Sequence, residues 1–113
     1  MKTKKPIQVQ KSSGNVFADL GVRNPQDSLT KAQLAHRICE VIVARRITQT
    51  KAAKLMGLDQ PKISALMRGS LKGFSAERLF RCLNDLGQEV KITIRSVPQA
   101  GRRGDIRVVT TAL

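Results

Sequence analysis

A chain of 113 residues can enclose one modest hydrophobic core, so we expect a single compact domain with loose ends. Its 21 Lys and Arg residues against 8 Asp and Glu residues give a formal net charge of +13, which favours polyanionic partners such as nucleic acid. No apolar run approaches the ~20 residues that cross a bilayer, and the start has no secretion signal. We therefore expect a soluble, cytoplasmic protein without membrane contact.

The remaining composition argues against enzymes and metal sites. The chain has one His and two Cys residues, and Cys39 and Cys82 are not spaced as metal ligands. We expect these thiols to be buried and reduced. There is no Gly-rich phosphate loop and no acid/base pair, so no catalytic activity, cofactor or metal is expected. With no Trp or Tyr, platforms for stacking single-stranded bases are scarce, which favours duplex DNA over RNA.

The first 24 residues contain little that could form a core. Residues 1–14 are basic and are predicted to be a mobile arm, in which Ile7 and Val9 alternate with glutamines as in a short edge strand. Residues 15–24 contain Val16, Phe17 and Leu20, and we expect this segment to dock on the domain.

Residues 25–87 are predicted to form a helical domain. Asn24 before Pro25 is a helix start signal, with Asp27 as an alternative, and apolar residues at helical spacing predict a helix over residues 25–46. Ser75 can cap a later helix that ends at Gly87. The apolar side chains of this domain expected to face its core are Leu34, Ile38, Val41, Ile42, Ala52, Ala53, Leu55, Met56, Ile63, Leu66, Met67, Leu79, Phe80, Leu83 and Leu86.

Two short helices are predicted between these longer ones. Thr48 can cap a helix over residues 49–56, for which Gly57 supplies a left-handed exit. Asp59 can cap the next helix, over residues 60–68, which accepts Pro61 in its first turn and stops before Gly69. The two helices can meet at a steep angle because Ala53 is small and Gly57 can adopt a positive φ.

After Gly87 the apolar period changes from 3.6 to 2. Val90, Ile92 and Ile94 alternate with polar residues, which predicts a half-buried strand. Its partner could be residues 106–110 of the same chain or the same strand of a second subunit. We expect residues 88–113 to form a strand or hairpin that helps to make a dimer.

The second short helix is expected to expose a polar surface without an acid. Gln60 can pair bidentately with adenine, Lys62 can reach guanine, and Pro61 offers an apolar contact to a thymine methyl group. Gly69, Ser70 and Lys72 follow that helix, where backbone amides and an ammonium group can contact phosphate.

The spacing of Ala53, Gly57, Leu58, Ile63 and Leu66, with Gln49 at the start, resembles the helix-turn-helix of the Cro and phage-repressor superfamily, the Xre family. The resemblance covers about residues 29–87. It implies a mainly α, lambda-repressor-like bundle, with the helix from Gln60 in the major groove, Gln49 on a phosphate, and a homodimer on a palindromic operator. The expected DNA contacts are Thr48, Gln49, Thr50, Asp59, Gln60, Pro61, Lys62, Ser64, Ala65, Arg68, Ser70 and Lys72.

Shorter motifs at residues 15–21, 31–34, 59–62 and 73–75 are similar to a subgroup of this family, the HigA-type antitoxins. Members of that subgroup pair with RelE-like ribonuclease toxins and repress their own operon. The resemblance thus implies an autorepressing antitoxin, although no toxin-contact residue carries over. The alternatives are a stand-alone phage-type repressor and, on charge alone, an RNA-binding protein.

Overall fold

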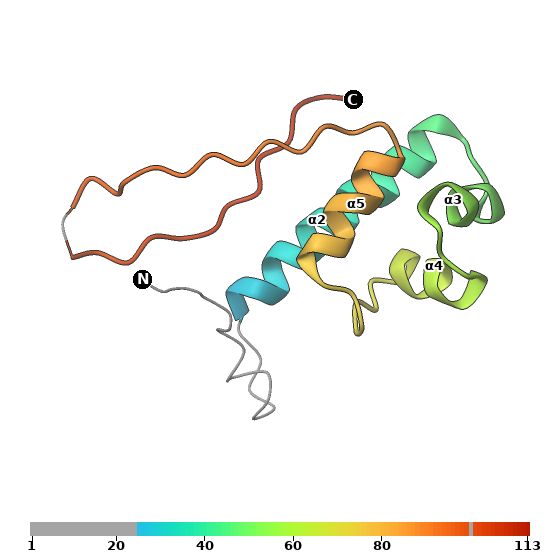
Figure 1. The fold of residues 1–113 in the computed structure, drawn as a ribbon, viewed down its shortest axis with the longest axis horizontal. Coiled ribbons are helices and arrows are strands. Elements are labelled where there is room, and N and C mark those ends of the chain that lie inside the picture. The colour runs from blue at the N-terminus through green and yellow to red at the C-terminus, as the bar shows by residue number, and fades with distance from the viewer. Residues whose placement is uncertain (1–24, 100) are drawn as a thin grey trace.

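The computed structural model describes residues 25–99 and 101–113. The basic arm 1–14, the docking segment 15–24 and the start signal at Asn24 lie outside these residues. The helices of the described chain are α2 (Pro25–Arg45), α3 (Gln49–Met56), α4 (Gln60–Met67) and α5 (Ala76–Asp85). Helices α2 and α5 pack side by side, and α3 and α4 lie together at one side of the pair (Figure 1). The predicted helices are confirmed, with bounds within two residues of those expected.

Side-chain caps begin the three later helices as predicted. Thr48 Oγ1 accepts a hydrogen bond from the Lys51 amide at 3.1 Å, and Asp59 Oδ1 accepts one from the Lys62 amide at 2.9 Å. Ser75 Oγ does the same for the amide of Arg78 at 3.1 Å. Each cap satisfies a backbone donor that has no partner inside its helix, and such a cap is worth about 1 kcal/mol.

The core is formed by apolar side chains from α2, α3, α4 and α5. Those of Ile38, Ile63, Leu66 and Leu79 are fully buried, as is Leu86, which follows α5 directly. One expectation about the core is wrong, because Leu55 is 44% exposed. Helix α3 turns Ala52, Ala53 and Met56 inward. At roughly 100° per residue, Leu55 then lies at the edge of that face. Met67 and Phe80 are half-buried at the margin of the core.

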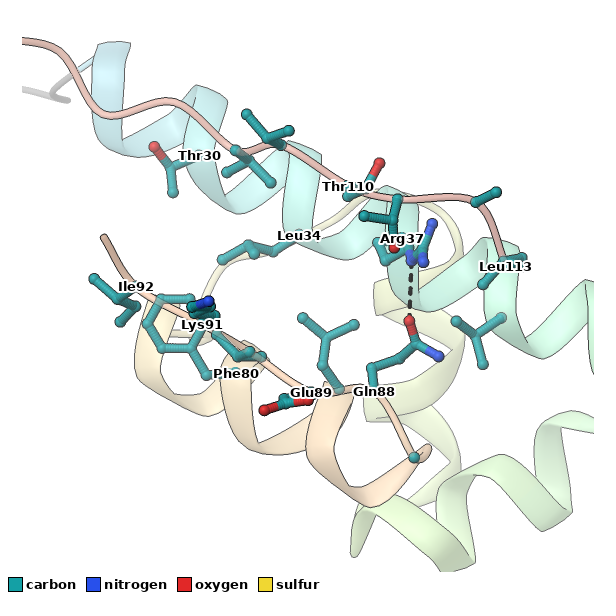
Figure 2. Close-up of a pocket in the computed structure, with 18 of the residues that line it drawn as sticks. Thr30, Leu34, Arg37, Phe80, Gln88, Glu89, Lys91, Ile92, Thr110 and Leu113 are labelled. Carbon is teal, nitrogen blue, oxygen red and sulfur yellow. Dashed lines mark hydrogen bonds between the residues drawn. The ribbon is translucent and has the colours of Figure 1, made fainter. Parts of the chain in front are cut away.

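Residues 88–99 form an extended arm that leaves the end of α5 and runs to the side away from α3 and α4, and residues 101–113 form a second extended arm that returns toward the helices (Figure 1). Neither arm is part of a strand in the described chain, so the prediction of a strand or hairpin within one chain is wrong. A cavity lined by both arms separates them near the helices (Figure 2), and the ladder of hydrogen bonds that defines a strand pair is not formed. Val90 and Val108, one from each arm, pack against the core.

No described helix is both long enough and apolar enough to cross a membrane.

Candidate nucleic-acid interface

Helices α3 and α4 are joined by a three-residue turn, Gly57 to Asp59, and pack against each other. Gly57 has φ 65°, a left-handed conformation that costs glycine little, and it ends α3 as predicted. The Leu58 amide donates to the Ala53 carbonyl at 2.9 Å, and the Leu58 side chain is buried. Turn chemistry and packing together fix the angle between the two helices.

Arg78 of α5 holds this turn from outside the two short helices. Its Nη2 atom donates a hydrogen bond to the Gly57 carbonyl oxygen at 3.3 Å. The sequence analysis did not identify Arg78, because the two residues are 21 positions apart and no local pattern connects them. The contact ties the helix-turn-helix to the rest of the bundle.

The first residues of α3 and α4 lie together at the surface. Gln49 and Gln60 are both exposed, and Gln60 Nε2 donates to Gln49 Oε1 at 3.5 Å. Thr48 and Thr50 are exposed beside Gln49. Helix N-termini carry partial positive charge and unpaired backbone N–H groups, both of which favour an anion. Two of the predicted contact residues, Gln49 and Gln60, are thus brought together by the fold.

The side chain of Lys62 does not extend into solvent as expected. Its side chain is half-buried, and Nζ lies 5.0 Å from the centroid of the Phe74 ring. The ammonium is also 3.2 Å from the position that a Cβ atom on Gly73 would occupy. A lysine over an aromatic face gains a cation–π attraction. The predicted contact between Lys62 and guanine therefore requires the side chain to leave this ring.

The other predicted contact residues lie along α4 or just after it. Pro61, Arg68, Ser70 and Lys72 are exposed, whereas Ser64 and Ala65 are half-buried. Arg68 Nη1 donates to Ser64 Oγ at 2.9 Å, which holds the guanidinium along its own helix. Asp59 is exposed, and its carboxylate accepts the helix-capping bond.

The basic side chains of this surface form none of the ion pairs found among the described residues. Lys51, Lys54, Arg68 and Lys72 are exposed, and Asp59 is the one acid between residues 41 and 76. The ion pairs of the described residues lie within α2 and within α5. A surface with unpaired basic groups and few acids attracts a polyanion and steers its approach.

Both thiols are free and belong to the interior. Cys82 is buried, and Cys39 is half-buried with Sγ 3.6 Å from Met67 Sδ. Burial raises the pKa of both thiols above the ordinary value of 9.0, and a neighbouring Arg78 partly opposes the rise at Cys82. A buried thiol that stays protonated is a packing group rather than a nucleophile.

Two short helices meet at a glycine turn, each with an exposed glutamine at its N-terminus, and basic side chains without ion pairs surround them. Together these features define a DNA-binding helix-turn-helix unit. Residues 16–95 match the model of a helix-turn-helix domain family. A solved structure that carries the name of an Xre-family transcriptional regulator has 42% sequence identity and a TM-score of 0.72, over 76% of this chain and 97% of that one. A search of curated proteins found no match. The chain belongs to the Xre family of helix-turn-helix transcriptional regulators.

Proposed function

We propose that this protein represses transcription by binding, as a homodimer, a palindromic duplex operator with α4 in the major groove. The observation that carries the proposal is the positive surface around the exposed side chains of Gln49 and Gln60. The basic residues of this surface form no ion pair in the described part of the chain. Phosphate contacts supply most of the affinity, and base contacts select the sequence. Two-fold symmetry in the protein then matches half-sites about one helical turn apart.

Gln60 is the residue we propose to read adenine. Its carboxamide is exposed at the start of α4, and its bond to Gln49 at 3.5 Å is long enough to exchange readily for a base edge. Gln49 then remains beside the backbone and contacts a phosphate. The other proposed contacts to bases or phosphate are Thr48, Thr50, Pro61, Lys62, Ser64, Ala65, Arg68, Ser70 and Lys72, and Asp59 caps α4 at the interface.

Operator selection from random duplexes, followed by binding assays on variants, tests this proposal. Gln60→Ala is expected to lose about ten- to a hundred-fold in affinity for the selected operator, because a bidentate pair is worth about 1–3 kcal/mol of discrimination. Binding to unrelated duplex DNA at the same salt concentration is expected to stay unchanged. Gln99→Ala is the matched control, since Gln99 is an exposed glutamine of the first arm and belongs to neither α3 nor α4. A Gln60→Ala variant with an unaltered operator footprint would contradict the assignment of α4.

We also propose that the repressor is the antitoxin of a RelE-like toxin and controls its own operon. Support comes from the short motifs shared with HigA-type antitoxins, and the proposed toxin-binding segment is either residues 1–24 or the C-terminal residues 88–113, because a chain end can fold onto a partner as it binds. Co-expression with the product of the neighbouring reading frame is expected to yield a complex and to rescue growth. A repressor that neither copurifies with that product nor rescues growth would instead be a stand-alone phage-type repressor.

A further inference from the structure

The side chain of Lys62 crosses from α4 to the loop that follows it. Lys62 belongs to the first turn of α4, and its Nζ atom lies 5.0 Å from the centroid of the Phe74 ring, near the end of that loop. The residue is half-buried, although a lysine on a surface helix usually extends its ammonium into water. The ammonium of Lys62 is thus held between α4 and the loop.

The ring beneath the ammonium is fixed in place. Phe74 is 2% exposed and packs in the hydrophobic core. Its backbone amide donates to the Leu71 carbonyl oxygen at 3.0 Å, which holds the loop beside the ring. A ring that is packed in the core does not move with the lysine, so its attraction for the ammonium defines one position for the charge.

Gly73 leaves room for the ammonium at this position. A Cβ atom on Gly73 would lie 3.2 Å from Lys62 Nζ, which is closer than ordinary van der Waals contact. Because glycine has no such atom, the ammonium can approach the loop backbone closely. The position of the charge therefore depends on the glycine as well as on the aromatic ring.

The ammonium of Lys62 keeps hydrogen-bond donors for a ligand. An ammonium group has three donors, and the face of a ring supplies no oxygen acceptor for them. Lys62 takes part in none of the ion pairs found among the described residues. The acid nearest in sequence, Asp59, accepts instead from the backbone amide of Lys62 at 2.9 Å. A fixed cation of this kind is suited to an anion from outside the chain.

The position of the ammonium favours a phosphate over a base as that anion. To contact guanine, a lysine must extend to the O6 and N7 atoms in the major groove. Lys62 would have to leave the Phe74 ring, and the lost cation–π attraction would offset part of the gain from the base. A phosphate needs only a point charge, without the planar geometry of a base contact. Lys72, exposed in the same loop, adds positive charge to this region.

We propose that Lys62 binds a phosphate of the DNA backbone from its place on the Phe74 ring, and that Phe74 is the positioning residue for this contact. Lys62 then contributes affinity that is common to all duplex sequences, and selection of the sequence depends on Gln60 and the exposed residues of α4. The inference rests on the proposed binding of duplex DNA by α4, and it replaces the expected contact between Lys62 and guanine.

Binding of the full chain to the selected operator and to an unrelated duplex, from about 50 to about 200 mM salt, tests this inference. Lys62→Met removes the charge and retains an unbranched apolar chain over the ring. It is expected to weaken both duplexes by the same factor, about five- to tenfold per bound subunit at about 0.1 M salt. The slope of log K against log salt concentration should fall by about one per bound subunit.

Lys31→Met is the matched control for the loss of one positive charge. Lys31 is also half-buried, but it lies on α2 in an ion pair with Asp27. Its substitution is expected to leave the salt slope of the parent chain unchanged. A slope that falls equally in both variants would show that net charge, and not the position of Lys62, is responsible.

Phe74→Leu tests the positioning role, because it keeps an apolar side chain in the core and removes the ring face. In this background Lys62→Met is expected to weaken binding at least about threefold less than it does in the parent chain. Equal effects of Lys62→Met in the two backgrounds would show that Phe74 does not position the ammonium.

Nuclear magnetic resonance of the unaltered chain gives a measurement that does not depend on the stability of Phe74→Leu. The ring current of Phe74 is expected to move the ε-methylene protons of Lys62 upfield of those of the exposed Lys54. We expect this upfield shift to persist when duplex DNA is added, because the ammonium binds phosphate without leaving the ring.

Three results would overturn the inference: loss of affinity in Lys62→Met for the operator alone, an unchanged salt slope, or Lys62 protons that lose their upfield shift on DNA. Each of them is compatible with a repressor that selects an operator. Conversely, a chain that selects no operator, but whose salt slope on unrelated duplex falls with Lys62→Met, would refute the proposed function and support the phosphate contact.

Discussion

The helical unit of residues 25–87 and the extended arms of residues 88–113 differ in how far they pair their backbone groups and bury their apolar side chains. In the helical unit, backbone groups pair within each helix, the later helix starts are capped by side chains, and residues such as Leu66 and Leu79 are fully buried. In the arms no strand is formed in the described residues, and Ile94 is 91% exposed. A helix closes its hydrogen bonds locally, whereas an extended segment needs a neighbour. Hence the helical unit is complete in one chain, and the arms are not.

The contrast also separates two kinds of contact surface. The proposed DNA-binding surface lies on α3 and α4, whose positions are fixed by the core and by the bond from Arg78 to Gly57. Six of the nine exposed large hydrophobic residues of the described chain lie on the arms, which extend to the other side of the helices (Figure 1). A helix that contacts DNA must hold its geometry before it meets DNA, while an extended segment forms a regular ladder of hydrogen bonds only when another strand pairs with it.

The largest expected difference between the two regions is in stability. Leu79→Ala is expected to reduce the free energy of unfolding by about 2–5 kcal/mol, because it leaves a cavity in a fully packed core. Ile94→Ala is expected to change it by less than about 0.5 kcal/mol in dilute protein. Urea unfolding followed by far-UV circular dichroism measures both. Equal losses for the two variants would mean that the arms belong to the cooperative core.

Two glycines with the same backbone conformation give a sharper comparison. Gly57 has φ 65° and Gly101 has φ 82°, and an added Cβ atom would meet nothing within 4 Å at either position. A left-handed residue with a side chain costs about 1–2 kcal/mol, so Gly57→Ala should lose about that amount in the packed turn. Gly101→Ala should lose less than about 0.5 kcal/mol, because its exposed turn is free to relax. Thermal unfolding compares the two, and equal losses would show that packing does not hold the Gly57 turn.

The smallest expected effect comes from the thiols, which only the helical unit contains. Burial raises the pKa of Cys39 and Cys82 above 9.0 in the folded chain, so above that pH the unfolded state releases these protons first. Their contribution to stability is complete below about pH 8 and is lost as the pH rises through the folded pKa values. Between about pH 7 and about pH 10, the free energy of unfolding should therefore fall more steeply for the parent chain than for a Cys39→Ala, Cys82→Ala variant. Parallel pH curves for the two proteins would contradict the assignment.

Local sequence signals predicted most of the helical unit. Thr48, Asp59 and Ser75 act as caps, and Gly57 adopts the left-handed conformation, because each of these features depends on residues within one turn of helix. The helix-turn-helix followed from the same signals, together with the spacing of small and apolar residues. Exposure of Gln60 was also predictable, since the opposite face of α4 contributes Ile63 and Leu66 to the core.

By itself, the sequence determined where the helices begin and end and which residues cap them. Only the tertiary structure placed Lys62 over Phe74, joined Gln49 to Gln60, brought Arg78 to the turn and left Leu55 exposed. It also decided that the two arms do not pair with each other, although both have the alternation of a strand. The reason is range: caps and turns depend on neighbours along the chain, whereas strand pairing and side-chain placement depend on which distant surfaces meet.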